Sequence, residues 1–293
     1  MTQKRSNKKA STRNILITAL VIALIAGGLV FTIIYRKNNQ PILDKIRDDK
    51  KIVVAMEGTW LPWTYHDAAT GELVGYDVEV AKAIAAKMGV GIEFQECPWD
   101  SIFAGIESGR YDIAVNGIDW TEERSKSFTL SEPYVYSYPV LIVRSDEEEI
   151  KDFADLKGKQ TANTVSSTYA ALAESYGATN QGVDDLNATF QLLIDGRINA
   201  TINSRDTFVA FMDENPNAPL KIASQATEAN PVVIAMIGGE RAETLVVEIN
   251  KAIAALREDG TLAALSVKYF GSDMTQAPAA AETAQTQNGE AAE

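Results

Sequence analysis

The stretch NGIDWTEERSKSF, residues 116–128, carries the side chain with the clearest chemical use in this chain. It directly follows YDIAV, an apolar run typical of a buried strand, and it places Arg124 beyond the carboxyl end of that strand. A guanidinium presents a planar fork of donors that suits a carboxylate through two charge-assisted hydrogen bonds. Thr121 can cap the short helix that starts here, which brings the positive end of a helix close to Arg124. The alternative is a surface ion pair between Arg124 and a nearby acid: Glu122, Glu123 or Glu132.

Composition argues against several other kinds of site. The chain has one cysteine, Cys97, and one histidine, His66, so it has no internal disulfide and too few ligands for a typical zinc centre. His66 lies in YHDAATGE, a hairpin-turn pattern, where a surface position is expected. The net charge is −13, and the seven basic residues of 1–37 leave the rest of the chain still more acidic. Such a body repels nucleic acid, so no nucleic-acid partner is expected.

Alternating strands and helices position the arginine stretch. KIVVAM (51–56), GIEFQEC (91–97) and YDIAVNG (111–117) are typical of strands, and the helical patterns VEVAKAIAAKM and SIFAGIES separate them. Asp77 and Asp100 are expected to cap these two helices. A β-α-β-α-β order implies parallel strands, and ligands bind at the carboxyl ends of such strands.

The pattern recurs after residue 150, which predicts two α/β lobes. The second half contains the helical patterns STYAALAESYG and ATFQLLIDGR, the strand INATINS, and two closing helices, the second of which Thr261 can cap. The extended segment SEPYVYSYPVLIV is expected to cross between the lobes, and pockets favour such interfaces. The expected boundaries are 48–136 with 236–273 for lobe 1, and 137–235 for lobe 2.

The amino terminus contains a long apolar stretch, ILITALVIALIAGGLVFTIIY. About 20 such residues span a bilayer as a helix. Because residues 1–13 are basic, that end is expected to stay cytoplasmic, with a single-pass signal anchor over 14–35 and the body outside. The alternative is a signal peptide cleaved near AGG, which would give a secreted or periplasmic protein. Residues 36–47 are predicted to form a linker, and 274–293 a disordered acidic tail, since QAPAAAETAQTQNGEAAE has no large apolar residue.

Five blocks occur in the order seen in one known family: GTWLPWTYHDAATGELVGYDVEVAKAIAAKMGV, PWDSIFAGIESGRYDIAVNGIDWTEERSKSFTLSEPY, DLKGK, LIDGRINATINS and REDGTLAALSVKYFG. Over residues 48–273 the chain resembles the family 3 extracellular solute-binding proteins, the polar amino acid receptors of ABC importers. The resemblance implies a periplasmic-binding-protein-like fold of type II, with two α/β lobes, two hinge strands and an amino acid clamped between the lobes. We expect a monomer without cofactor or metal that docks on a membrane permease. The chain is most similar to the cystine-type branch, and general polar amino acid binders remain close.

The resemblance assigns roles to residues around the arginine. In the family, an arginine in a T-x-x-R block binds the ligand carboxylate, and Arg124 in TEER matches it. Gly117 and Asp119 match positions that meet the ligand ammonium, although the usual residue at the second position is Ser or Thr. The family often has an aspartate for the ammonium after the strand INATIN, where this chain has Ser204, with Asp206 two residues on. We hypothesise that Asp119 supplies the missing carboxylate; the alternatives are Asp206, and a local role for Asp119.

The other ligand contacts that the resemblance implies come from a lobe 2 loop and from lobe 1 side chains. Three residues match a loop whose amide and hydroxyl groups close on the carboxylate: Ser166, Ser167 and Thr168. Trp60 and Trp99 match positions where aromatic rings stack on the ligand, whereas Trp63 matches a core position. Trp120 is next to the site and could face away from it. Glu57 matches a position near the far end of the ligand, where it would suit a polar or cationic group or remain solvated.

Two other classes of function fit the same fold. Some relatives are dehydratases of the prephenate or arogenate type, for which Glu57 or Asp119 could serve as the general acid. A sensor receptor lobe would require a signalling domain, in this chain or in a partner. We expect a binding protein with no catalytic residue, whose lobes close around the ligand.

Overall fold

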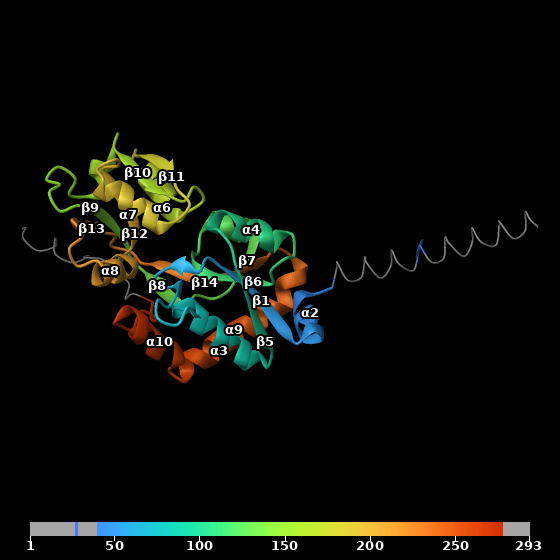
Figure 1. Ribbon diagram of the computed structural model, residues 1–293. Coiled ribbons are helices and arrows are strands. Elements are labelled where there is room, and N and C mark those ends of the chain that lie inside the picture. Colours follow the sequence, from blue (N-terminus) through green and yellow to red (C-terminus); the bar gives the residue numbers. More distant parts are fainter. Residues whose placement is uncertain (1–26, 29–39, 278–293) are drawn as a thin grey trace, which may run out of the picture.

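The computed structural model describes residues 27–28 and 40–277, and in it two lobes lie side by side (Figure 1). The predicted basic segment, nearly all of the predicted anchor and the first part of the predicted linker lie outside the described residues, as does the tail from residue 278 onward. Within the described part of the chain, no helix is long and apolar enough to cross a membrane.

Lobe 1 is built on a sheet of six strands in the order β5-β1-β6-β14-β7, with β8 also paired to β14. The first three strands of this order are parallel, which confirms the β-α-β-α-β prediction, and β14 runs antiparallel to its three partners. A smaller antiparallel sheet, β2-β3-β4, lies beside it. The strands are β1 (Lys51–Met56), β2 (Thr59–Trp60), β3 (Thr64–His66), β4 (Leu73–Val74), β5 (Gly91–Glu96), β6 (Ile113–Asp119), β7 (Phe128–Leu130), β8 (Val135–Ser137) and β14 (Asn230–Ile237).

Helices cover both faces of this sheet because its strands are apolar on both sides. On one face of β1, Val54 and Met56 belong to a hydrophobic cluster that includes residues of α3 and α9. On the other face, Ala55 belongs to a second cluster that includes residues of α4. Figure 1 shows α3, α9 and α10 together on one side and α4 on the other. The helices of lobe 1 are α2 (Ile42–Asp49), α3 (Tyr76–Met88), α4 (Trp99–Glu107), α5 (Glu122–Ser127), η2 (Glu240–Ala242), α9 (Glu243–Glu258) and α10 (Thr261–Phe270).

Lobe 2 has a central antiparallel sheet, β12-β9-β13, and a parallel pair, β10-β11. Its core is formed by apolar residues of β9, α7 and α8, among them Ile142, Phe190 and Phe208. The strands are β9 (Pro139–Arg144), β10 (Gln160–Asn163), β11 (Thr179–Gly182), β12 (Ala200–Ser204) and β13 (Leu220–Gln225). The helices are η1 (Phe153–Leu156), α6 (Thr168–Ser175), α7 (Leu186–Ile194) and α8 (Arg205–Glu214).

The chain crosses between the lobes twice. The first crossing is at Tyr138, between β8 of lobe 1 and β9 of lobe 2, as expected from the extended segment. The second lies at residues 226–229, between β13 and β14. The predicted boundary at 235–236 is therefore wrong, because β14 pairs with β6, β7 and β8 and so belongs to lobe 1 from Asn230 onward.

Both predicted flanks of the body need correction. Residues 42–47 of the predicted linker lie in α2, whose apolar residues Ile42, Leu43 and Ile46 are buried in the lobe 1 core. At the other end, residues 272–277 form what we call the C-terminal strap, which lies against β8. The amide of Tyr136 donates to the carbonyl of Met274 at 2.9 Å, and the guanidinium of Arg257 donates to the carbonyls of Thr275 and Pro133.

The predicted helix caps are partly wrong. Asp77 and Asp100 each lie inside the first turn of a helix, because α3 begins at Tyr76 and α4 at Trp99. Thr261 is likewise the first residue of α10 and does not cap it. Instead of capping α3, the buried carboxylate of Asp77 accepts hydrogen bonds from the amide of Gly117 at 2.6 Å and from the hydroxyl of Tyr134 at 2.7 Å. Burial raises the pKa of Asp77 to about 7.

Candidate functional site

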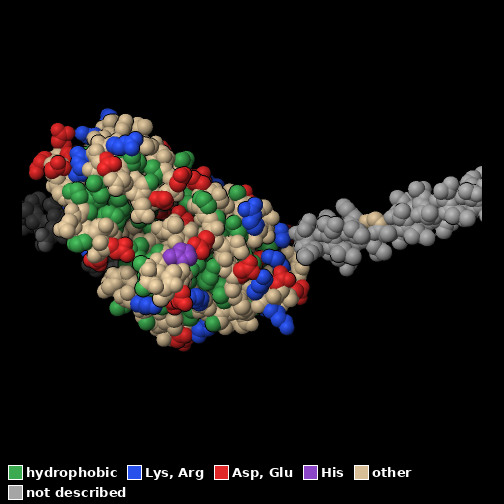
Figure 2. All heavy atoms as spheres, in the orientation of Figure 1, with side chains coloured by type: hydrophobic (Ala, Val, Ile, Leu, Met, Phe, Trp, Pro, Cys, Tyr) green, Lys and Arg blue, Asp and Glu red, His purple; other side chains and the backbone are tan. Residues whose placement is uncertain are grey.

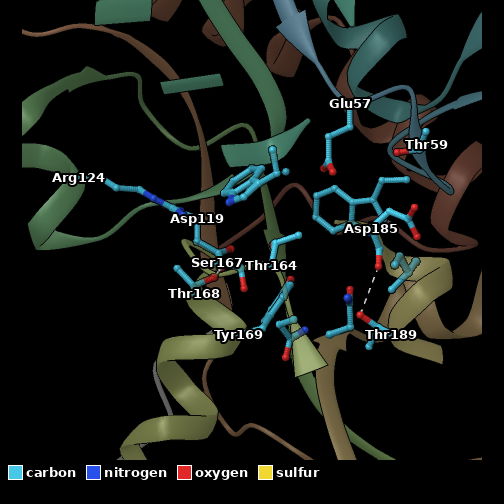
Figure 3. Close-up of a pocket in the computed structure, with 16 residues that line it drawn as sticks. Glu57, Thr59, Asp119, Arg124, Thr164, Ser167, Thr168, Tyr169, Asp185 and Thr189 are labelled. Atoms are coloured by element: carbon cyan, nitrogen blue, oxygen red, sulfur yellow. Dashed lines mark hydrogen bonds between the residues drawn. The ribbon is translucent and has the colours of Figure 1, made fainter. Parts of the chain in front are cut away.

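A pocket lies between the lobes. Residues of both lobes line it, and Figure 3 shows their side chains pointing toward one another across it. Lobe 1 contributes Glu57, Thr59, Trp60, Trp99, Gly117, Asp119 and Arg124. Lobe 2 contributes Asn163, Thr164, Ser167, Thr168, Tyr169, Asp185, Leu186, Thr189 and Asn203.

Arg124 provides the positive charge at one end of the pocket. Thr121 caps α5 as predicted, because its hydroxyl accepts the amide of Arg124 at 3.0 Å. The guanidinium donates to the carbonyl of Asp119 at 2.8 Å and lies 5.3 Å from the ring centroids of both Trp99 and Phe103. Burial lowers its pKa. Within residues 40–277 no ion pair joins Arg124 to the nearby glutamates, so the surface-pair alternative is not what the structure has.

Asp119 lies beside this arginine and is almost completely buried, with 3% of its surface exposed. Its Oδ2 accepts hydrogen bonds from the hydroxyl of Thr168 in lobe 2 at 2.5 Å and from the side-chain amide of Asn230 at 2.9 Å. Its Oδ1 has no hydrogen-bond partner among the described residues. Burial raises the pKa of Asp119 despite the hydrogen bond from Thr168 and the charge of Arg124. A buried carboxylate oxygen without a donor favours a cationic ligand group at this point.

Gly117 and two tryptophans form a wall of the pocket. Gly117 has a φ of 54°, and a Cβ there would lie 2.6 Å from the ring of Trp60. The ring of Trp60 stacks on Trp63 with centroids 5.5 Å apart, and Trp63 lies in the core as its position implied. The indole Nε1 atoms of Trp60 and Trp99 are buried without a hydrogen-bond partner in the described chain. Trp120 is 46% exposed and does not line the pocket.

Carboxylates gather at the other end of the pocket. Figure 3 shows Glu57, Thr59 and Asp185 there, away from Arg124. Glu57 accepts a hydrogen bond from the side chain of Asn116 at 2.7 Å, while burial, and the nearby charges of Asp185 and Asp100, raise its pKa to about 7. The carboxylate of Asp185 caps α7. This end therefore holds carboxyl groups from both lobes.

Eight of the eleven predicted site residues line the pocket, and three do not. Ser204 caps α8 by accepting the amide of Thr207. Asp206 accepts hydrogen bonds from Ser204 and Ser137, which places it at the first crossing between the lobes, and burial raises its pKa to about 6. Ser166 bonds to Asp100 of lobe 1 outside the pocket. Hydrogen bonds to neighbouring elements hold each of these three side chains outside the pocket. A match by sequence position carries no information about such bonds.

Sequence reasoning missed Asp185 and most of the polar lobe 2 lining, such as Asn163, Thr189 and Asn203. Two local signals were available. Asp185 stands directly before the helical pattern LNATFQLLI, where an N-cap is expected, and helix starts point into clefts of this fold class. Asn203 lies near the carboxyl end of the predicted strand INATINS. No comparable signal marks Asn163 or Thr189.

Comparison with known proteins identifies the family. Residues 52–272 match the model of the bacterial extracellular solute-binding proteins, family 3. The chain belongs to this family. A probable amino-acid ABC transporter-binding protein of Haemophilus influenzae is 36% identical over 254 residues, which are 87% of this chain and 97% of that protein. Membership in a family of solute-binding proteins favours binding over the dehydratase alternative.

Two solved relatives bear on the conformation of this family member. An ancestral arginine-binding protein bound to arginine gives a TM-score of 0.70 at 33% identity, covering 76% of this chain and 99% of that one. The L-cystine solute receptor of Neisseria gonorrhoeae, unliganded and open, is 37% identical but gives only 0.55, covering 80% and 99%. Rotation of the lobes between open and closed forms produces such a difference. The contact between Asp119 and Thr168 likewise requires closed lobes.

We expect Gly117→Ala to weaken solute binding, because its Cβ would push the ring of Trp60 out of place. Gly109→Ala is the matched control, since Gly109 also has a positive φ of 71° but nothing within 4 Å of the added Cβ. Each change places a side chain at a positive φ, which should cost about 1 kcal/mol of stability in thermal unfolding, and Gly117→Ala should cost more because its Cβ meets the Trp60 ring. Only Gly117→Ala should lose affinity in calorimetry, and equal affinities for the two variants would contradict this role for Gly117.

Proposed function

We propose that the protein captures an amino acid between its lobes and delivers it to the permease of an ABC importer. The observation that carries the proposal is a pair of groups at one end of a pocket lined by both lobes: Arg124, and Oδ1 of Asp119, which has no hydrogen-bond partner within residues 40–277. A zwitterion offers a carboxylate to the first and an ammonium to the second. The family, and the name of the Haemophilus influenzae relative, support the same function.

The charges at the far end favour a ligand with a second cationic group. The pocket lining contains one cation, Arg124, and three carboxylates, of which Asp119 is matched by the α-ammonium. Glu57 and Asp185 remain, both half-buried, and a second cationic group of the ligand would be attracted to them. Arginine and cystine, the ligands in the names of the two solved relatives, both bring a distal cation. Cystine also brings a second carboxylate, which the lining would have to hold without a second guanidinium.

Closure is the proposed mechanism of capture. Lobe 2 reaches Asp119 through Thr168. A ligand bound to lobe 1 therefore gains contacts with lobe 2 only when the lobes close. Bending at the two crossings, Tyr138 and residues 226–229, would open the pocket for entry and release. In this proposal Arg124 holds the carboxylate, Asp119 and the carbonyl of Gly117 hold the ammonium, and the rings of Trp60 and Trp99 contact the side chain.

A thermal-shift screen of the twenty amino acids and cystine tests the function. We expect arginine or cystine to raise the melting temperature most, because each places a cation near Glu57 and Asp185. Ligand at 100 times its Kd adds about 2.7 kcal/mol of stability, which corresponds to about 2–4 °C for a body of this size. If no amino acid shifts the melting temperature, the proposed function is wrong.

Asp206 provides the control for the role of Asp119 in the same screen. Asp119→Ala should abolish the shift, since it removes the partner of the ammonium. Asp206→Ala removes an equally buried carboxylate that does not line the pocket, and it should leave binding within a few-fold of the wild type. Loss of binding in Asp206→Ala alone would assign the ammonium to Asp206 instead.

The affinity for arginine should rise with pH through 7. Because burial holds the pKa of Glu57 at about 7, most of this carboxyl is protonated at pH 6 and ionised at pH 8. A guanidinium favours the ionised form, so binding releases a proton and the Kd should fall about tenfold between pH 6 and pH 8. Glu57→Gln should flatten this profile, whereas Glu107→Gln, an exposed acid on α4, should keep it. A profile as steep in Glu57→Gln as in the wild type would refute the assignment, which calorimetry can check.

We further propose that residues 14–35 anchor the protein in the membrane with its body on the extracytoplasmic side. The support is the uncharged stretch of 15–35 with its basic leading flank. In a bacterial host, the full chain should stay in the membrane fraction after carbonate washing with its mass intact, whereas a chain lacking residues 1–37 should not. A soluble extracytoplasmic protein that begins near residue 28 would instead establish signal cleavage.

A further inference from the structure

Two exposed residues join the lobes just outside the pocket. The hydroxyl of Ser166 in lobe 2 donates to Oδ1 of Asp100 in lobe 1 at 2.5 Å, and the amide of Ser166 points to the same oxygen at 3.4 Å. We propose that this pair, the closure clasp, sets the lifetime of the closed complex without touching the ligand. The proposal rests on the function proposed above, since it concerns closure around the same ligand.

The position of the clasp separates it from the ligand contacts. Neither Asp100 nor Ser166 lines the pocket, although the residue next to each does: Trp99 on α4 and Ser167 at the start of α6. The clasp therefore lies one residue outside the pocket on each lobe. Asp100 is in the first turn of α4, where the helix dipole stabilises a negative charge and so strengthens the acceptor.

The clasp is connected to the residue proposed to bind the carboxylate. The guanidinium of Arg124 donates to the carbonyl of Ser166 at 3.4 Å while it also holds the carbonyl of Asp119. One short loop of lobe 2 thus meets lobe 1 at three points, through Asp100, Arg124 and, by way of Thr168, Asp119. If a bound ligand oriented Arg124, the guanidinium would hold the carbonyl of Ser166 against lobe 1. The hydroxyl of Ser166 would then also lie against lobe 1.

A contact that exists only in the closed form stabilises that form alone. Opening must break the clasp before the ligand can leave, whereas entry into the open form does not involve it. The clasp should accordingly slow dissociation and leave association unchanged. Most affinity differences between related complexes arise from their dissociation rates. Because it does not touch the ligand, it should act equally on every ligand that the pocket accepts.

Ser166→Ala tests this inference, with Ser175→Ala as the control. Ser175 is an exposed serine at the end of α6 whose hydroxyl bonds only within its own helix, to the carbonyl of Leu172. Stopped-flow dissociation should be about three- to tenfold faster in Ser166→Ala, as expected for loss of one hydrogen bond, and unchanged in Ser175→Ala. The factor should be the same for the two amino acids that bind most tightly. A factor that differs between them would show that Ser166 contacts the ligand and would overturn the clasp.

A double-mutant cycle isolates the pair. Asp100 also contributes negative charge near Glu57, so Asp100→Ala alone could alter ligand preference. In the Asp100→Ala background, adding Ser166→Ala should have no further effect on dissociation. Additive effects of the two changes on the dissociation rate, or an unchanged dissociation rate in Ser166→Ala, would overturn the clasp and leave the proposed function standing. Wild-type protein that binds no amino acid would overturn the proposed function and the clasp together.

Discussion

The burial of one carboxylate, that of Asp119, is the constraint on which the closed structure depends. Three parts of the fold meet at this side chain: the end of β6, the first residue of α6 in lobe 2, and Asn230, where the chain re-enters lobe 1. Burial disfavours the ionised form, and the two donors satisfy only one of the two oxygens. A ligand ammonium would supply the missing donor and charge at the point where both lobes already converge, so binding and closure would favour each other.

A second buried carboxylate keeps this arrangement in place. Asp77 fixes the amide of Gly117, whose left-handed conformation lets the ring of Trp60 approach the backbone. The same carboxylate holds the hydroxyl of Tyr134, which directly precedes β8 and the first crossing. The pocket wall and the hinge thus share one anchor inside lobe 1. Figure 2 shows one face of the same body, on which acidic and basic side chains are scattered among hydrophobic ones.

The sequence predicted those features that depend on short stretches of chain. A buried strand followed by a capped helix places Arg124 correctly, because both the strand end and the cap of Thr121 are local. The boundary of lobe 2 and the positions of Ser166 and Asp206 were missed for a common physical reason. β14 pairs with three strands that lie about a hundred residues earlier in the chain, and the two side chains take partners on the opposite side of the domain interface. Such pairings depend on tertiary structure that periodicity does not encode.

The C-terminal strap has a practical consequence. Tyr136 of β8 and Arg257 of α9 both bond to the strap, so residues 272–277 lie next to the first crossing, about which the lobes would turn. The pivot is the region that shifts least when a two-lobed protein opens. A fluorescent domain fused after residue 277 would therefore serve as a stationary reference, and a second dye on the rim of lobe 2 would report opening as a change in energy transfer.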